Sequence, residues 1–268
     1  MKRTTVLLLA VGLGLGCSEK KKSTPSTMAP PAALPLPQPT GKALIPPTTK
    51  QLVTAITDSW TSTTAQLQRW QRTDKGAWTA VGVPWPAVIG KTGSAWGAGI
   101  HGAGAPGREG PVKKEGDGKS PAGVFAIRES YGYADAPPKD TKLEYTSTGR
   151  GDLECVDDPA SEHYASIVDR KQVAGDWESA EQMMRDDALY TWVVDIAHNP
   201  ERKPRVGSCI FLHVWSGPES STIGCTAMEE PKLVELIKSL DPAGNPVFVL
   251  LPRADYQALA VAWGLPAQ

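Results

Sequence analysis

The sequence predicts a mainly β fold with few helices, and two observations carry this prediction. From about Gln51 onwards, short apolar runs alternate with turn signals at intervals of about 8 to 15 residues, which is typical of a sheet-rich domain. These runs are rich in β-branched and aromatic residues, which pack well on a pleated surface. The expected strands cover 67–72 and 77–81, which form a hairpin around Asp74-Lys75-Gly76, and then 124–127, 191–196, 209–214 and 247–251.

Helix is predicted in two places. Pro231 suits the first turn of a helix, and the apolar residues of 233–240 recur on one face before Pro242 ends the pattern. A second, less regular helical pattern covers 179–189. The helical share of the chain is therefore expected to be small.

Composition limits the class of protein. The chain has 268 residues, of which 40% are hydrophobic, enough for one large domain or two small ones. The formal net charge is -1, from 28 basic and 29 acidic residues. This balance lacks the basic footprint of a nucleic-acid binder, so no nucleic-acid partner is expected.

The N-terminus carries a targeting signal. Two basic residues precede an apolar run over 6–16 that ends at Cys17. The run is shorter than the roughly 20 residues that a spanning helix needs, so residues 1–17 are predicted to be a cleaved signal peptide. The segment 13–17 resembles the bacterial lipoprotein processing box, which predicts lipidation of Cys17 and a membrane-held protein facing the periplasm. Ser18 is not an aspartate retention signal, which favours the outer membrane; the alternative is a plain secretory signal.

Residues 18–49 are predicted to be a tether. The segment is rich in lysine at first and then in Pro, Ala and Thr, with no periodic apolar pattern. Extended chain of this kind reaches about 3.1 Å per residue, or roughly 100 Å in all. A lipid-anchored domain on such a tether would reach a polymer layer lying away from the membrane.

Export also affects the cysteines, because thiols outside the cytoplasm are open to oxidation. Besides Cys17, the chain holds Cys155, Cys209 and Cys225. One hypothesis pairs Cys155 with Cys209 and leaves Cys225 as a working thiol; the alternative leaves all three unpaired.

The chemistry is carried by His213, at the end of an expected strand, and by Cys225, twelve positions later and preceded by Gly224. In Cys–His catalysis the imidazole takes the thiol proton and the thiolate attacks. Gly224 leaves room for a substrate carbonyl, and the backbone N–H groups beside it could form an oxyanion hole. If the pair faces a solvated groove, the imidazolium should lower the pKa of the thiol.

The order His213, Thr222, Gly224, Cys225 resembles the L,D-transpeptidase catalytic-domain (YkuD-like) family, whose motif is a strand-end His, a loop, and then Ser or Thr, any residue, Gly and the nucleophilic Cys. Further segments similar to the bacterial branch of this family are 88–93, 114–125, 157–159, 207–208 and 210–213. The likeness covers about 78–252. Three positions depart from the family pattern: Ser120 replaces a usual Thr, Ile223 replaces a frequent second His, and Ala227 replaces a frequent Arg.

The resemblance implies a β-sandwich catalytic domain over 50–254, with a short helix after the cysteine loop, a few peripheral helices and a C-terminal tail over 255–268. It implies that Cys225 is the nucleophile and His213 the proton donor and acceptor. We further expect a backbone carbonyl near Thr222 to orient the imidazole, and Gly224 to contribute backbone to the oxyanion hole. Neither a cofactor nor a metal is implied.

The implied reaction is acyl transfer on the tetrapeptide stem of peptidoglycan. The thiolate attacks the carbonyl on the L-centre of the third residue, releases the terminal D-alanine and leaves a thioester. The acceptor is a second stem peptide, a protein lysine or water, which gives cross-linking, protein anchoring or carboxypeptidase activity. The expected partners are therefore stem peptides, the membrane through the lipid, and a protein in the anchoring case.

Competing hypotheses are a sortase-like transpeptidase and a catalytically inactive wall-binding lipoprotein. Sortases place their His much further upstream of the Cys, and NlpC/P60-type peptidases reverse the order of the two residues. A zinc site is not expected, because the Cys and His residues lack close ligand pairs. His101, His163 and His198 are expected to have structural or loop roles.

Overall fold

The computed structural model describes Met1 and residues 43–267. Most of the predicted leader and tether, including the lipidation candidate Cys17, lies outside the described residues. No helix in the described part of the chain is long and apolar enough to cross a membrane.

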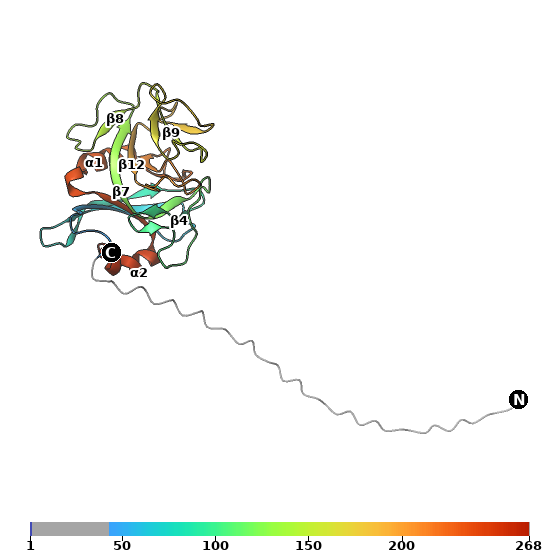
Figure 1. The fold of residues 1–268 in the computed structure, drawn as a ribbon. Coiled ribbons are helices and arrows are strands. Elements are labelled where there is room, and N and C mark those ends of the chain that lie inside the picture. The colour runs from blue at the N-terminus through green and yellow to red at the C-terminus, as the bar shows by residue number, and fades with distance from the viewer. Residues whose placement is uncertain (2–42, 268) are drawn as a thin grey trace. The chain divides into compact units, whose positions relative to one another are not determined.

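Ten strands of the described residues pair into one large sheet, in the order β12-β13-β14-β3-β2-β1-β15-β7-β4 with β8 beside β7. The strands are β1 (Gln51–Thr57), β2 (Thr64–Arg72), β3 (Trp78–Val88), β4 (Ser94–Trp96), β7 (Ser120–Gly132), β8 (Tyr145–Ser147), β12 (Trp192–Ile196), β13 (Phe211–Val214), β14 (Thr226–Met228) and β15 (Val247–Pro252). Strand β12 also pairs with β7, so the sheet closes on itself (Figure 1). The predicted mainly β fold is confirmed.

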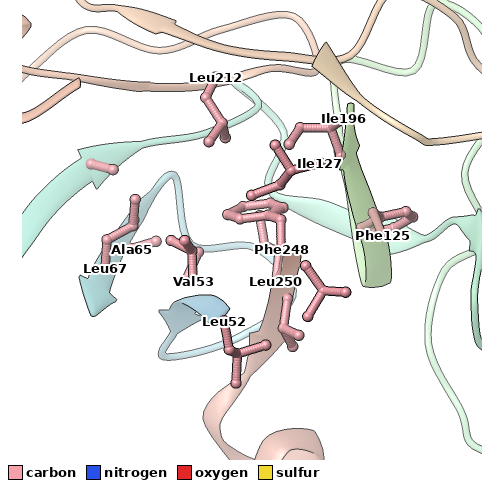
Figure 2. Close-up of a cluster of buried hydrophobic side chains, with 14 of the residues drawn as sticks. Leu52, Val53, Ala65, Leu67, Phe125, Ile127, Ile196, Leu212, Phe248 and Leu250 are labelled. Atoms are coloured by element: carbon pink, nitrogen blue, oxygen red, sulfur yellow. The ribbon is translucent and has the colours of Figure 1, made fainter. Parts of the chain in front are cut away.

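The core lies inside this closed sheet and is centred on β15. Every residue of β15 is buried, between the parallel β1 and the antiparallel β7. Phe248 pairs with Val53 on one side and with Phe125 on the other, and Figure 2 shows these side chains with Leu250 in the hydrophobic cluster. Burying a side chain of this size contributes about 1.5–3 kcal/mol, so these strands form a rigid support for the loops at their ends.

Two α-helices pack against the sheet. The predicted helix is present as α1 (Glu230–Ser239), with Pro231 in its first turn and three buried apolar side chains. The second, α2 (Arg253–Trp263), covers most of the segment expected to be a tail. That expectation is corrected: Tyr256, Leu259 and Trp263 are buried, and Gly264 ends the helix in the left-handed conformation that glycine adopts readily. A short 3-10 helix, η1 (Pro242–Gly244), follows α1.

A second sheet of three strands lies at the end of the fold opposite α2 (Figure 1). Its order is β10 (Ile167–Asp169), β9 (Leu153–Val156), β11 (Ala180–Gln182). We call residues 150–189, which contain this sheet, the cap. The helix predicted over 179–189 is wrong, because this stretch forms β11 and a series of turns. The remaining strands, β5 (Ala98–Gly99) and β6 (Gly102–Ala103), form a small ribbon.

Candidate active site

The register of two neighbouring strands places His213 and Cys225 on one face of the sheet. Strand β13 runs parallel to β14, with Leu212 opposite Thr226 and His213 opposite Ala227. Cys225 directly precedes Thr226, and alternate residues of a strand point to the same face. The side chains of Cys225 and His213 therefore project from adjacent strands towards the same side.

The Cys225 thiol lies in a small cluster of buried side chains and polar backbone groups. The residue is 5% exposed. The backbone N–H of Phe211 donates to its sulfur at 3.4 Å, and the thiol donates to the carbonyl oxygen of Cys209 at 3.5 Å. Tyr190 packs in the same buried cluster, and its hydroxyl lowers the pKa of the thiol. Two backbone groups thus hold the sulfur before any substrate arrives.

Burial raises the pKa of the Cys225 thiol to about 12, and the Glu181 carboxylate adds to this rise. Hydrogen bonds from Phe211 and Tyr190 act in the opposite direction. The sequence predicted a lowered pKa on the condition that the pair faces a solvated groove, and the structure does not meet that condition. The free protein therefore holds Cys225 as a neutral thiol at neutral pH.

The His213 imidazole is also buried, at 7% exposure. Its Nδ1 lies 2.7 Å from the carbonyl oxygen of Val214, a contact that requires a proton on Nδ1 and leaves Nε2 as the basic nitrogen. Burial lowers the pKa of His213 to about 4. The orienting carbonyl expected near Thr222 is thus supplied by Val214, since the Thr222 carbonyl accepts the backbone N–H of Lys91 at 2.7 Å.

Two hydroxyl groups fix the backbone at Cys225. Ser120 Oγ and Thr222 Oγ1 each donate to the carbonyl oxygen of Cys225 at 2.7 Å. Ser120, fully buried, also accepts the backbone N–H of Gly90 at 2.9 Å. Thr222 therefore acts through its side-chain hydroxyl, whereas the sequence singled it out for a backbone carbonyl nearby. Its Oγ1 also accepts the N–H of Gly224 at 3.2 Å, so this N–H is not aimed at an oxyanion hole.

A disulfide joins the cap to the segment that contacts Cys225. Cys155 of β9 is bonded to Cys209, with 5.9 Å between their Cα atoms, which is the first of the two hypotheses for the cysteines other than Cys17. Cys225 is the free cysteine of the described residues. Cys209 has a φ of 54°, an unfavourable left-handed conformation for a residue with a side chain. The disulfide holds it there, with its carbonyl towards the Cys225 thiol.

A pocket of about 180 Å³ opens onto Cys225. Five charged side chains line it: Lys91, Lys113, Glu115, Asp157 and Glu181. Lys113 is buried and paired with Asp117 at 2.6 Å. Lys91 is exposed and makes no ion pair with any residue that the structure describes, so its ammonium is free to meet an anion in the pocket.

Sequence reasoning missed a set of polar residues that borders the thiol. Tyr190 donates its hydroxyl proton to Glu181 at 2.7 Å. Arg185 lies 3.4 Å from Glu181 and 2.9 Å from Asp187. The signal was available, because the charged run 185–187 lies shortly before the aromatic Tyr190 and the strand that begins at Trp192, but the segment was interpreted as a helix.

The other histidines have packing roles. His198 is buried and bridges the backbone of Ala98 and Val206. His101 accepts the backbone N–H of Val124, and His163 packs against the Trp177 ring. The described residues contain no group of three or more His, Cys, Asp or Glu side chains that could hold a metal ion.

The comparisons with known proteins identify the family of the chain. The family model for the YkuD L,D-transpeptidase catalytic domain matches residues 60–249, a range that contains both His213 and Cys225. No curated protein and no solved structure gives a significant match. The match covers well over half of the chain, so the chain belongs to the L,D-transpeptidase catalytic-domain family.

Proposed function

We propose that this protein is a peptidoglycan L,D-transpeptidase that acts through a Cys225 thioester. The observation that carries the proposal is the placement of Cys225 and His213 on one face of two adjacent parallel strands, beside a pocket that opens onto the thiol. Within the family the substrate is the tetrapeptide stem of the cell wall.

The first half-reaction forms the thioester. The sulfur of Cys225 attacks the carbonyl carbon on the L-centre of the third stem residue, while the thiol proton passes to Nε2 of His213. Nε2 then gives this proton to the nitrogen of the departing D-alanine as the C–N bond breaks. The Val214 carbonyl holds Nδ1–H throughout and keeps the basic nitrogen directed away from the backbone.

The second half-reaction resolves the thioester. An acceptor amine attacks the thioester carbonyl and transfers a proton to Nε2, and the C–S bond breaks to regenerate the thiol. When the amine belongs to another stem peptide the product is a cross-link, and when it belongs to a protein lysine the product is an anchored protein. Attack by water gives a shortened tripeptide stem.

Lys91 supplies the cation for a substrate carboxylate in this pocket. Its backbone is tied to the nucleophile loop through the Lys91 N–H to Thr222 carbonyl bond at 2.7 Å, and its side chain packs over Gly118. Stem peptides carry several carboxylates, so an unpaired ammonium beside the thiol adds affinity without a new buried charge.

The N-terminal sequence supports the proposal that this activity acts in the cell envelope. A lipid on Cys17 would hold the enzyme at a membrane on the periplasmic side, and the tether would let the domain reach the wall. Stable attachment needs more than one acyl chain. Labelling with a radioactive fatty acid, compared between the wild type and Cys17→Ala, tests this part separately.

The test of the activity is incubation of the mature protein with disaccharide-tetrapeptide, followed by mass analysis. Loss of D-alanine, with or without cross-linked dimers, is expected for the wild type and absent from Cys225→Ala and His213→Ala. Lys91→Met should raise KM more than it lowers kcat, and Lys75→Met, on an exposed turn, is the matched control. Equal turnover by Cys225→Ala would refute the proposal. Peptide binding without turnover in the wild type would favour an inactive wall-binding lipoprotein instead.

A further inference from the structure

We propose that Tyr190 is a catalytic residue whose hydroxyl donates a hydrogen bond to the Cys225 sulfur when the thiolate forms, and that Glu181 competes for the same hydroxyl proton. The proposal rests on Cys225 being the nucleophile of the proposed function. It does not depend on which peptide or acceptor the enzyme uses.

The Tyr190 ring is held in one orientation by its neighbours. The residue is 2% exposed. Its ring makes edge contacts with Phe211 and His213, at centroid distances of 5.8 Å and 5.2 Å. The Arg185 guanidinium covers the ring at 5.1 Å. A ring packed on these sides fixes where its hydroxyl group lies.

That hydroxyl lies between two acceptors. It donates to Oε1 of Glu181 at 2.7 Å. The Cys225 sulfur, whose pKa this hydroxyl lowers, lies in the same buried cluster as Tyr190. A phenol has a single proton to donate. While Cys225 is a thiol, its own S–H donates to the Cys209 carbonyl, and the Tyr190 proton belongs to Glu181.

Formation of the thiolate changes this balance. Sulfur then carries a full charge and becomes a strong acceptor, and hydrogen bonds to charged groups are stronger than neutral ones. By this proposal the Tyr190 hydroxyl then turns its proton from the carboxylate to the sulfur. Together with the Phe211 N–H, it gives the thiolate two donors in a buried site.

Glu181 opposes formation of the Cys225 thiolate. It lies in β11 and lines the pocket that opens onto Cys225. Its negative charge opposes a thiolate nearby, and Arg185, held by Asp187, offsets that charge in part. The other charged or titratable groups around the thiol are His213 on β13 and, further away, Lys113.

The two variants of this pair should act in opposite directions. Tyr190→Phe keeps the ring against His213 and Phe211 but removes the donor, so the thiolate should form at higher pH. Glu181→Gln keeps the shape but removes the competing charge, so the thiolate should form at lower pH. A purely structural role for either residue would not produce shifts of opposite sign.

The experiment is a thiolate titration on the mature protein. The ultraviolet absorbance of the thiolate is recorded against pH for the wild type and each variant, with Cys225→Ala subtracted, and alkylation by iodoacetamide is timed in parallel. Tyr190→Phe should slow alkylation at a fixed pH by roughly tenfold, the size expected for a lost bond to a charged group. Glu181→Gln should accelerate it. Tyr145→Phe, whose hydroxyl bonds the Ala134 carbonyl, is the matched control and should match the wild type.

An unchanged titration in Tyr190→Phe, or shifts of the same sign in both variants, would overturn the inference. Near-ultraviolet circular dichroism shows whether either variant has lost its fold, and the double variant gives a second measurement, because it should lose most of the effect of Glu181→Gln. No peptide takes part in these measurements. A failure of the L,D-transpeptidase proposal would therefore leave the predicted shifts in place, and their absence would leave that proposal untouched.

Discussion

Removal of the Cys155–Cys209 disulfide should lower both the stability and the activity of the protein. The bond closes a loop with a sequence separation of 54 residues. In the chain-entropy model a loop of this length stabilises the folded state by about 4 kcal/mol. For a domain of this size that corresponds to a fall in the melting temperature of roughly 10 °C. Activity should fall as well, because Cys209 keeps its left-handed conformation, and its carbonyl at the thiol, through the bond to the cap.

Calorimetry with and without a phosphine reductant measures the effect. The double variant Cys155→Ser with Cys209→Ser should melt at the lower temperature in both conditions, which separates loss of the bond from any other action of the reductant. Thiol counting on the denatured mature domain, with Cys225 as reference, should give one free thiol before reduction and three after it if Cys17 is lipidated. Three thiols before reduction, or an unchanged melting temperature, would refute the reasoning.

Two further predictions follow from the buried groups. Burial lowers the pKa of His198 and His213 to about 4. Between about pH 6.5 and 4 the unfolded chain therefore binds protons that the folded chain does not. The free energy of unfolding should decrease as the pH is lowered through this range, by about 1.4 kcal/mol per pH unit for each histidine. Burial raises the pKa of Asp195 to about 6, so this residue acts in the opposite direction below that pH. Urea denaturation at pH 7 and pH 5 measures the combined effect of the three groups. A protein that is more stable at pH 5 would contradict the lowered pKa of the two histidines. Ser120→Ala should cost about 1–3 kcal/mol and reduce turnover, because it leaves a buried N–H without its acceptor and frees the Cys225 carbonyl from one of its two hydroxyl donors. Ser120→Thr keeps the hydroxyl and should keep the activity, and equal behaviour of the two Ser120 variants would show that the hydroxyl has no such role.

The sequence predicted the strands well because their signals are local. The runs at 124–127, 191–196, 209–214 and 247–251 all lie within or overlap strands, since β-branched and aromatic residues in short runs suit a pleated, buried surface. The helix beginning near Pro231 was predicted for a similar reason. Closure of the sheet through the pairing of β12 with β7 is a long-range contact that no local pattern encodes.

The cap was predicted poorly for a physical reason. Its strands β9, β10 and β11 are three or four residues long and mostly half-buried, so they have too few apolar positions to show a period of two. In the segment predicted as a helix, Arg185 instead pairs with Glu181 and Asp187 and covers the Tyr190 ring. Tertiary contacts decided this segment against its local pattern.

The candidate site was predicted in its residues but not in its environment. The order of the motif residues along the chain identified Cys225 and His213. The burial of these two side chains depends on the cap, which the sequence did not reveal. This is why the expected solvated ion pair became a neutral thiol and a neutral imidazole. The carbonyl that accepts the Nδ1 proton of His213 could not be predicted either. The motif does not distinguish the Val214 carbonyl from other backbone carbonyls nearby.

The same small sheet controls both neighbours of the thiol. In the register of β9 and β11, Cys155 lies opposite Glu181. Cys155 holds Cys209, whose carbonyl accepts the thiol proton, and Glu181 holds the Tyr190 hydroxyl. A movement of the cap would therefore alter the acceptor for the S–H group and the competitor for the phenol proton at once.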